Sequence, residues 1–152
     1  YLCANVNLPY LLALRIKLLS FDAYQIETMP KEHANSIGQF LRDGGIIAWV
    51  IVPTDSVSLN KETPETLAGL LSGYWEAVSQ HTGLSAKQIA EQALIAPARC
   101  CLKNIGQVGA SDDTIVCEAR GSPNLTVDER LVETAFNYLR TLSAILKDNF
   151  DL

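Results

Sequence analysis

The amino-acid sequence predicts an α/β fold built on a parallel sheet, and three observations support this prediction. Short apolar runs alternate with segments whose apolar residues recur at helical spacing, which is typical of strand–helix units. Residues Ile46–Val52 are apolar throughout, as expected of a strand buried on both faces. The chain has 152 residues, of which 48% are hydrophobic, so it can bury one sizeable core. We expect about four strand–helix units in a single domain, or part of one, spanning residues 1–152.

The first two strands are expected near the start of the chain. Tyr1–Asn5 begins the first unit, and Pro9 can open a short helix after it, because proline is favoured at the first helical position. Leu18–Phe21 is a short apolar run that predicts a buried strand ending at Asp22. A polar connection leads from this strand to the next helix.

Glycine and proline bound the next helix and strand. Gly44 and Gly45 are expected to end the helix, because glycine is favoured just after the last helical turn. Ile46–Val52 is the third predicted strand, and Pro53 closes it. The buried face of the helix is predicted to consist of Ala34, Ile37, Phe40 and Leu41.

The segment Thr63-Pro64-Glu65 predicts the start of a long helix. The threonine hydroxyl can cap the first turn, proline suits the first helical position, and the glutamate faces the positive end of the helix dipole. A stripe at helical spacing is interpreted as facing the core and given no chemistry: Leu67, Leu70, Leu71, Tyr74, Trp75 and Val78.

Two helices, a strand and a loop complete the chain. Ser85 and Gln88 form a capping box for a short helix, and Leu94–Ala98 is the last predicted strand. Leu102–Asn124 has no clear period and predicts a long loop. The final helix is expected to begin at a capping box of Thr126 and Glu129, with an inner side made of Leu131, Ala135, Tyr138, Leu139, Leu142 and Leu146.

Charge and composition bear on the compartment and the partners. A net charge of -5 without a basic stripe argues against nucleic acid, because phosphate backbones are bound by clustered lysine and arginine. The apolar runs are far shorter than the roughly 20 residues that span a bilayer, so we expect no membrane partner. Without a recognisable export signal we expect a cytoplasmic protein whose four cysteines are thiols or metal ligands. The absence of an initiating methionine indicates a fragment, a processed product or an engineered piece.

Three chemically suitable side chains are predicted at the carboxyl ends of strands, where functional groups of parallel α/β folds gather. Cys3 ends the first strand, Asp22 ends the second, and Cys100, beside Cys101, follows the fourth. Two thiolates and a carboxylate from separate strand ends can hold one zinc ion and leave a position for substrate. The alternative is structural: Cys3 is a small buried apolar residue, Asp22 caps the next segment, and the cysteine pair is incidental.

Three segments resemble a known family. They are Leu19-Ser20-Phe21-Asp22-Ala23-Tyr24, Gly44–Thr54 and Pro97–Lys103. They are similar to the catalytic domain of cobalamin-independent methionine synthase and its shorter relatives, among the uroporphyrinogen decarboxylase-like barrels. The resemblance covers most of the chain and is weakest over Ile105–Asn124. It implies the C-terminal half of a TIM (β/α)₈ barrel, whereas four parallel strands alone also fit an open doubly wound sheet.

The resemblance also implies a zinc site. In the family, a His-x-Cys motif, an acidic residue after the next strand and a final cysteine bind the metal. The matching positions here are Cys3, Asp22, where the methionine synthases commonly carry glutamate, and Cys100. Tyr1 stands where the family has histidine, and a neutral phenol is a poor zinc ligand, so zinc binds with fewer protein ligands, Cys101 contributes, or the site is lost.

Other candidate residues receive weaker assignments. Thr54, Asp55 and Ser56 follow the third strand and can hydrogen-bond a substrate amino acid, or they are a turn that ends the strand. Cys117 is interpreted as an ordinary free thiol. The chain's two histidines, His33 and His81, are assigned to helices and not to the metal site.

The implied activity is transfer of a methyl group from a folate or corrinoid donor to a thiol such as homocysteine, which forms methionine. Half a barrel needs a partner, and the candidates are the missing N-terminal half or a second copy of the chain, with self-association expected because the sheet has open edges. Two alternatives remain: a non-catalytic half-barrel module for binding or assembly, and a corrinoid-linked methyltransferase with another thiol acceptor.

Overall fold

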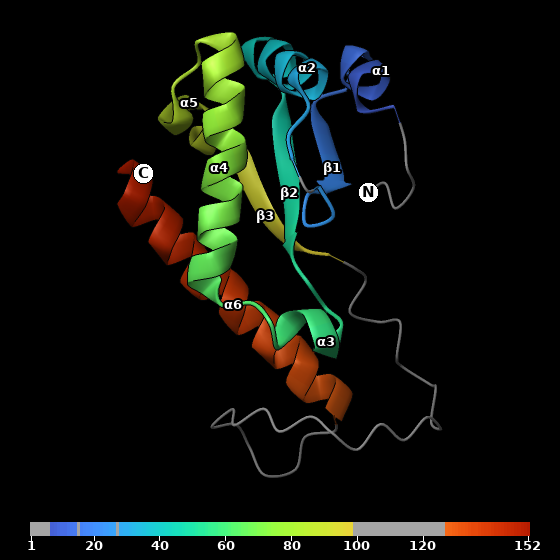
Figure 1. Cartoon of the computed structure of the whole chain (residues 1–152), viewed down its shortest axis with the longest axis vertical. Coiled ribbons are helices and arrows are strands. Elements are labelled where there is room, and N and C mark those ends of the chain that lie inside the picture. The colour runs from blue at the N-terminus through green and yellow to red at the C-terminus, as the bar shows by residue number, and fades with distance from the viewer. Residues whose placement is uncertain (1–6, 15, 27, 99–126) are drawn as a thin grey trace.

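The computed structural model of the chain describes residues 7–14, 16–26, 28–98 and 127–152 (Figure 1). These residues form an α/β fold in which helices pack on a parallel sheet. In chain order the elements are α1 (Leu8–Ala13), β1 (Leu18–Asp22), α2 (Lys31–Arg42), β2 (Ile46–Val52), α3 (Ser56–Leu59), α4 (Pro64–Thr82), α5 (Ala86–Glu91), β3 (Ala93–Pro97) and α6 (Val127–Phe150).

The sheet has three parallel strands in the order β1-β2-β3. Leu18 pairs with Ile46 on one side of β2, and Ala48 pairs with Leu94 on the other. Helix α2 connects β1 to β2, and α3 to α5 connect β2 to β3. The sheet is therefore open within the described residues, and they do not close a barrel. This supports the predicted α/β class at the level of a three-stranded parallel sheet.

The predicted elements are largely confirmed. The strands expected at Leu18–Phe21, Ile46–Val52 and Leu94–Ala98 are β1, β2 and β3, with bounds that differ by a residue at most. The strand expected at Tyr1–Asn5 lies outside the described residues, as do the Leu102–Asn124 loop and the capping residue Thr126. Short helix α3 was not predicted, because its four residues contain no apolar period.

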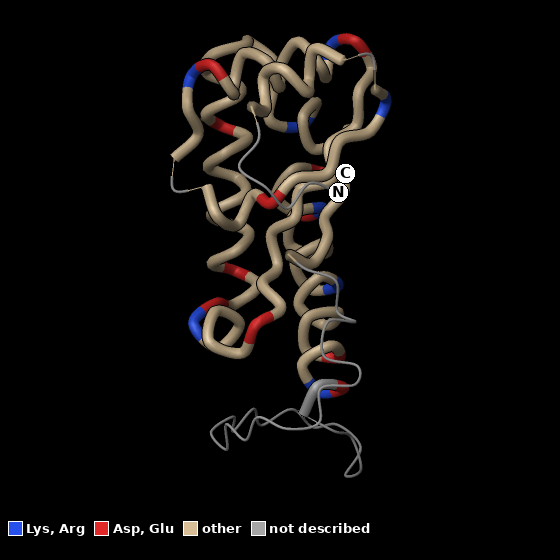
Figure 2. The backbone as a smooth tube through the Cα atoms, turned by 90° about the vertical axis from the view of Figure 1, so that its right-hand side faces the viewer, with Lys and Arg blue, Asp and Glu red and all other residues tan. Residues whose placement is uncertain are grey.

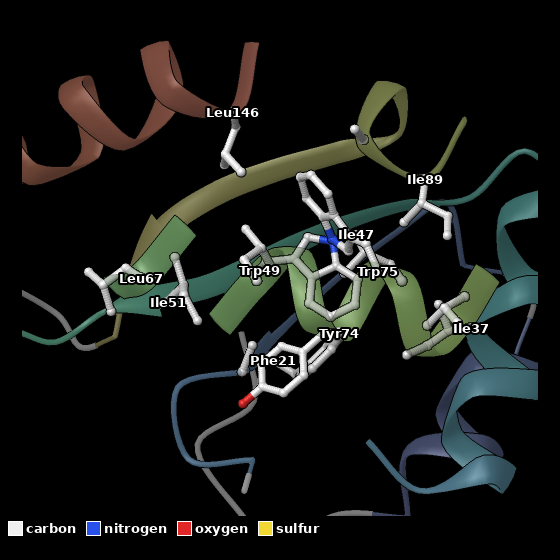
Figure 3. Packing of buried hydrophobic residues seen from close by; sticks show 14 of the residues in the cluster. Phe21, Ile37, Ile47, Trp49, Ile51, Leu67, Tyr74, Trp75, Ile89 and Leu146 are labelled. Carbon is white, nitrogen blue, oxygen red and sulfur yellow. The ribbon is translucent and has the colours of Figure 1, made fainter. Parts of the chain in front are cut away.

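The core lies between one face of the sheet and the helices. Edge-to-face aromatic contacts cross it in sequence: Phe21 of β1 meets Trp49 of β2 at a centroid distance of 5.3 Å, and Trp49 meets Trp75 of α4 at 6.4 Å. Trp75 also contacts Phe150 of α6 at 5.1 Å. Figure 3 shows Trp49, Trp75 and Phe21 gathered at the centre of this cluster. The predicted apolar stripe of α4 is thus confirmed as core.

The opposite face of the sheet has a different character. Because side chains alternate along a strand, Leu18, Ile46 and Leu94 point away from the aromatic cluster. Their exposed fractions are 50%, 39% and 50%, whereas Ala48 and Val50 of the central strand are buried on that face. Within the described residues, the sheet therefore presents large apolar side chains on the side that the helices do not cover.

The predicted starts of α4 and α5 are confirmed by their cap geometry. Oγ1 of Thr63 accepts a hydrogen bond from the Thr66 amide at 3.2 Å, and Oγ1 of Thr66 accepts one from the Thr63 amide at 2.9 Å. Ser85 and Gln88 make the corresponding capping box at α5. Helix α4 ends at Thr82 and is capped by Gly83, whose φ of +72° is a conformation that glycine adopts without strain.

Helices α2 and α4 pack closely at a glycine. A Cβ atom on Gly38 of α2 would collide with the side chain of Thr82 in the last turn of α4. The Thr82 hydroxyl in turn donates to the Val78 carbonyl at 2.7 Å, and the Arg42 guanidinium donates to the Thr82 carbonyl. A glycine at position 38 thus sets how near the two helices approach.

Among the described residues, no helix is both long and apolar enough to cross a membrane.

Candidate functional site

The candidate site lies at the edge of the sheet where the strands end. Parallel strands run in one direction, so their carboxyl ends share an edge. Asp22 is the last residue of β1 and pairs with Val50 of β2. Strand β2 ends two residues later, and its chain continues through Thr54 into α3, which lies beyond the carboxyl ends of the strands in Figure 1.

Asp22, the predicted ligand that the structure describes, is half-buried. Its Oδ2 atom accepts a hydrogen bond from Nε2 of Gln25 at 2.8 Å, and its Oδ1 atom is shielded from solvent. The neutral Gln25 amide thus helps to orient the carboxylate. A metal-binding carboxylate is commonly oriented by a hydrogen bond of this kind.

The loop after β1 is attached to the rest of the fold at several points. The amides of Ala23 and Tyr24 both donate to the Val50 carbonyl, at 2.9 and 3.1 Å. The Tyr74 hydroxyl of α4 donates to the Ile26 carbonyl. Ala23 is completely buried, so the chain turns tightly against β2 immediately after Asp22.

Glu62, in the short connection between α3 and α4, contacts three different parts of the chain. Its Oε1 atom accepts from the Tyr24 hydroxyl at 3.1 Å, and its Oε2 atom accepts from the Thr66 hydroxyl at 2.6 Å. Its backbone carbonyl accepts from the Tyr138 hydroxyl of α6 at 3.1 Å. Burial, together with the hydrogen bond to Glu62 and its charge, raises the pKa of Tyr24 above its ordinary value.

The residues predicted to bind substrate follow β2 as expected. Asp55 is the N-cap of α3, and its Oδ1 atom accepts from the Ser58 amide at 2.8 Å. Ser56 is the first residue of that helix, and Thr54 is half-buried just before it. The structural interpretation of a strand-ending turn therefore accounts for Asp55, and the assignment of these three residues to substrate stays a prediction.

Of the three predicted zinc ligands, the structure describes one, Asp22. Cys3 and Cys100 lie outside the described residues, as do Tyr1, Cys101 and Cys117. The two histidines lie on helices, as predicted: His33 is half-buried on α2, and His81 is exposed in the last turn of α4. In the part of the chain that the structure describes, no three histidine, cysteine or acidic side chains are grouped so as to hold a metal.

A cavity of about 570 Å³ lies at the other end of the sheet. Its lining includes Leu12 of α1 and Phe40 of α2, together with Lys17 and Gly45, which directly precede β1 and β2. It is therefore next to the amino ends of the strands, whereas Asp22 is at a carboxyl end. We do not assign it to the candidate site.

Charged residues are dispersed over the described backbone. Figure 2 shows the lysines and arginines interspersed with acidic residues along the chain, without a continuous basic stripe in the parts drawn. Three carboxylates, those of Asp22, Asp55 and Glu62, belong to the segments at the carboxyl ends of β1 and β2.

Three residues of this edge were not predicted to have a role: Tyr24, Gln25 and Glu62. Tyr24 comes two residues after the end of β1, and Gln25 follows Asp22 by three residues, a spacing that allows a local side-chain contact. Glu62 precedes the helix cap at Thr63, and its role could not be read locally because two of its three partners lie 38 and 76 residues away. Comparisons of the chain with protein-family models, with curated proteins and with solved structures find no match.

Proposed function

We propose that this chain is part of a zinc-dependent methyltransferase that moves a methyl group from a folate or corrinoid donor to a thiol such as homocysteine, forming methionine. The observation that supports the proposal best is the placement of Asp22. Its carboxylate ends a strand of a parallel sheet, is partly shielded from water and is oriented by the Gln25 amide. Carboxylates in such surroundings are suited to binding a metal ion.

In this proposal Asp22 would bind zinc together with Cys3 and Cys100. Bound zinc would lower the pKa of the substrate thiol, so that a thiolate is present at neutral pH. The sulfur–methyl bond forms as the bond between the methyl group and its donor breaks, and the electron pair of that bond leaves with the donor. Gln25 keeps the Asp22 carboxylate oriented, and Thr54, Asp55 and Ser56 are proposed to hydrogen-bond the amino-acid part of the substrate.

The order of the strands supports our proposal that the chain is the C-terminal half of a TIM barrel. Successive parallel strands lie side by side, and the helices share one core with the same face of the sheet. Right-handed crossovers that always advance in one direction give this arrangement, as in a (β/α)₈ barrel. A complete doubly wound sheet would carry helices on both faces, whereas one half of such a sheet would share the arrangement described here.

The open face of the sheet supports a requirement for a partner. Leu18, Ile46 and Leu94 would lie in the interior of a closed barrel, where apolar side chains fill the space. We propose that the missing N-terminal half of the barrel, or a second copy of this chain, covers them. The remaining partners in the proposal are a small-molecule thiol and a methyl donor.

A second candidate is a non-catalytic half-barrel module for binding or assembly. Two observations favour it: Asp55 is engaged as a helix cap, and Tyr1 replaces the family's histidine. A corrinoid-linked methyltransferase with a different thiol acceptor would use the same proposed site, so only assays with different donors and acceptors separate it from the first candidate.

The zinc content of the protein tests the proposal. We would measure zinc per chain by elemental analysis of protein purified without added metal, in the parent and in Cys3→Ser, Asp22→Ala and Cys100→Ser. Asp43→Ala is a matched control, because Asp43 is an exposed carboxylate beside the cavity at the opposite end of the sheet. We expect stoichiometric zinc in the parent and control and a loss in the three variants. A folded, metal-free parent would contradict the enzyme and favour the binding module.

A further inference from the structure

Glu62 is the point at which three separate segments at the carboxyl edge of the sheet are joined. Its carboxylate accepts from Tyr24, in the loop after β1, and from Thr66, in the first turn of α4. Its carbonyl accepts from Tyr138 of α6. Both carboxylate oxygens and the carbonyl oxygen of this one residue are therefore engaged, each by a different hydroxyl group.

Local structure does not account for this set of contacts. The capping box of α4 is made by Thr63 and Thr66, so the helix has its cap without the Glu62 carboxylate. The bond from Tyr24 spans 38 residues and the bond from Tyr138 spans 76. Glu62 is half-buried, as expected of a side chain that ties packed elements together.

The segment held by Glu62 is the one that follows Asp22. The Ala23 and Tyr24 amides bond to β2, and the Tyr74 hydroxyl holds the Ile26 carbonyl. These bonds hold the backbone of the loop, whereas the bond to Glu62 holds the Tyr24 side chain. Gln25, whose amide orients the Asp22 carboxylate, lies between the two held residues. The direction of the carboxylate therefore depends on the conformation of this loop.

We propose that Glu62 is a positioning residue for Asp22: by holding Tyr24 it keeps the loop after β1, and with it the Gln25 amide, in the conformation that aims the carboxylate. This inference rests on the proposed zinc-dependent function. It also gives α6 a part in the site, because Tyr138 fixes the backbone of the residue that holds the loop.

Three substitutions separate positioning from general stability. Glu62→Ala removes the carboxylate, and Tyr24→Phe removes only the hydroxyl that donates to it. Glu62→Gln keeps one acceptor oxygen of the same reach for Tyr24 and replaces the oxygen that faces Thr66 with an amide nitrogen, so it should preserve the contact with Tyr24. Glu76→Ala is the control, because Glu76 is an exposed glutamate on α4. Tyr24→Phe keeps the inference open to test if Glu62→Ala fails to fold.

The experiment measures zinc affinity by competition with a chromogenic chelator, and amide hydrogen exchange of residues 23–26 by mass spectrometry. In Glu62→Ala and Tyr24→Phe we expect faster exchange in this loop and zinc binding weakened by roughly 10-fold, the lower end of what outer-shell partners contribute. Glu62→Gln and Glu76→Ala should match the parent. A merely structural role would lower the unfolding temperature without changing the zinc affinity of the folded protein.

The outcomes also separate this inference from the proposed function. If the parent binds zinc and both variants bind it equally well, the positioning role is wrong while the zinc site stands. If the folded parent binds no zinc, the proposed function fails and the role of Glu62 toward a zinc ligand fails with it.

Discussion

Trp75 of α4 packs edge to face against Trp49 of β2, with ring centroids 6.4 Å apart and ring planes at 68°. Both rings are almost completely buried, and Phe150 of α6 packs against the Trp75 ring. The contact therefore joins the sheet, α4 and α6, and it is the natural place to test how much the core contributes to stability.

Trp75→Ala should lower the free energy of unfolding by about 3–5 kcal/mol, because it leaves a cavity among residues that cannot fully collapse. Trp75→Phe should cost less, since phenylalanine keeps a ring and removes an indole N–H that has no hydrogen-bond partner among the described residues. Urea unfolding followed by circular dichroism measures both. Tyr10→Ala is the control, because this side chain is 64% exposed. An equal loss in the control would argue against a localised core effect.

Gly38→Ala should destabilise the protein by about 1–3 kcal/mol, because the new methyl group collides with Thr82. Thr82→Ser removes the nearest methyl group and keeps the hydroxyl that bonds to Val78, so it should relieve part of the loss in the double variant. Thermal unfolding of the parent, Gly38→Ala, Thr82→Ser and the double variant measures the coupling between the two positions. As a matched control, Gly73→Ala in α4 meets nothing within 4 Å and should stabilise by up to about 1 kcal/mol. Additive effects at positions 38 and 82 would contradict the close approach of α2 and α4.

The phenol groups of Tyr24 and Tyr74 should lose their protons at a higher pH than an ordinary tyrosine does. Burial raises the pKa of both Tyr24 and Tyr74 above the ordinary value of 10.0, and the hydrogen bond to Glu62 raises that of Tyr24 further. The folded state thus favours the protonated phenols, so their contribution to stability is complete below pH 10 and is lost as the pH rises through the folded-state pKa values. Ultraviolet absorbance of phenolate in the parent, Tyr24→Phe and Tyr74→Phe tests this. Each variant should lose part of the most alkaline phase, and an unchanged curve would be inconsistent with it.

Thr63→Ala should lower the free energy of unfolding by about 1 kcal/mol, because the first turn of α4 loses the cap that its hydroxyl provides.

The same substitution should also change how the stability of the protein falls as the pH becomes acidic. A hydrogen bond from Thr63 and one from its own backbone amide lower the pKa of Glu65 below 4.5, so this contribution is present above pH 4.5 and lost as the pH falls through the lowered value. Urea unfolding between pH 3 and pH 7 should show a shallower acid dependence in Thr63→Ala than in the parent. Identical profiles would exclude this contribution of Thr63.

The open face of the sheet should mediate self-association of the isolated chain. Leu94→Lys places a charge on that face, where Leu94 is 50% exposed, and should shift the protein toward monomer. Val57→Lys is the control, because Val57 is 62% exposed on α3 and not on the sheet. Sedimentation velocity over a range of concentrations measures the change. A parent that stays monomeric throughout would contradict self-association and favour a separate partner.

Much of the secondary structure could be predicted because its signals are local. The seven apolar residues of β2 are continuous, and the two capping boxes join residues three positions apart. Helix α3 was not predicted, because its four residues carry no such local signal. Its cap residue Asp55 had two possible roles, and only the bond to the Ser58 amide assigns it one in the structure.

The candidate site was predictable only in part. The position of Asp22 follows from the sequence, since it ends an apolar strand and the carboxyl ends of parallel strands share an edge. The long-range contacts of the loop that follows Asp22 could not be predicted from the sequence. The contact between Tyr24 and Glu62 depends on where β2, α3 and α4 carry the chain over 38 residues.

The sequence by itself thus determined the α/β class, the three described strands and the caps of α4 and α5, because alternation, apolar runs and capping act between residues close together in the chain. The tertiary structure decided the strand order, the exposed face with Leu18, Ile46 and Leu94, and the meeting of Tyr24, Glu62 and Tyr138. The physical reason is that these features depend on how whole elements pack, and packing is set by the combined fit of many side chains and not by any single local pattern.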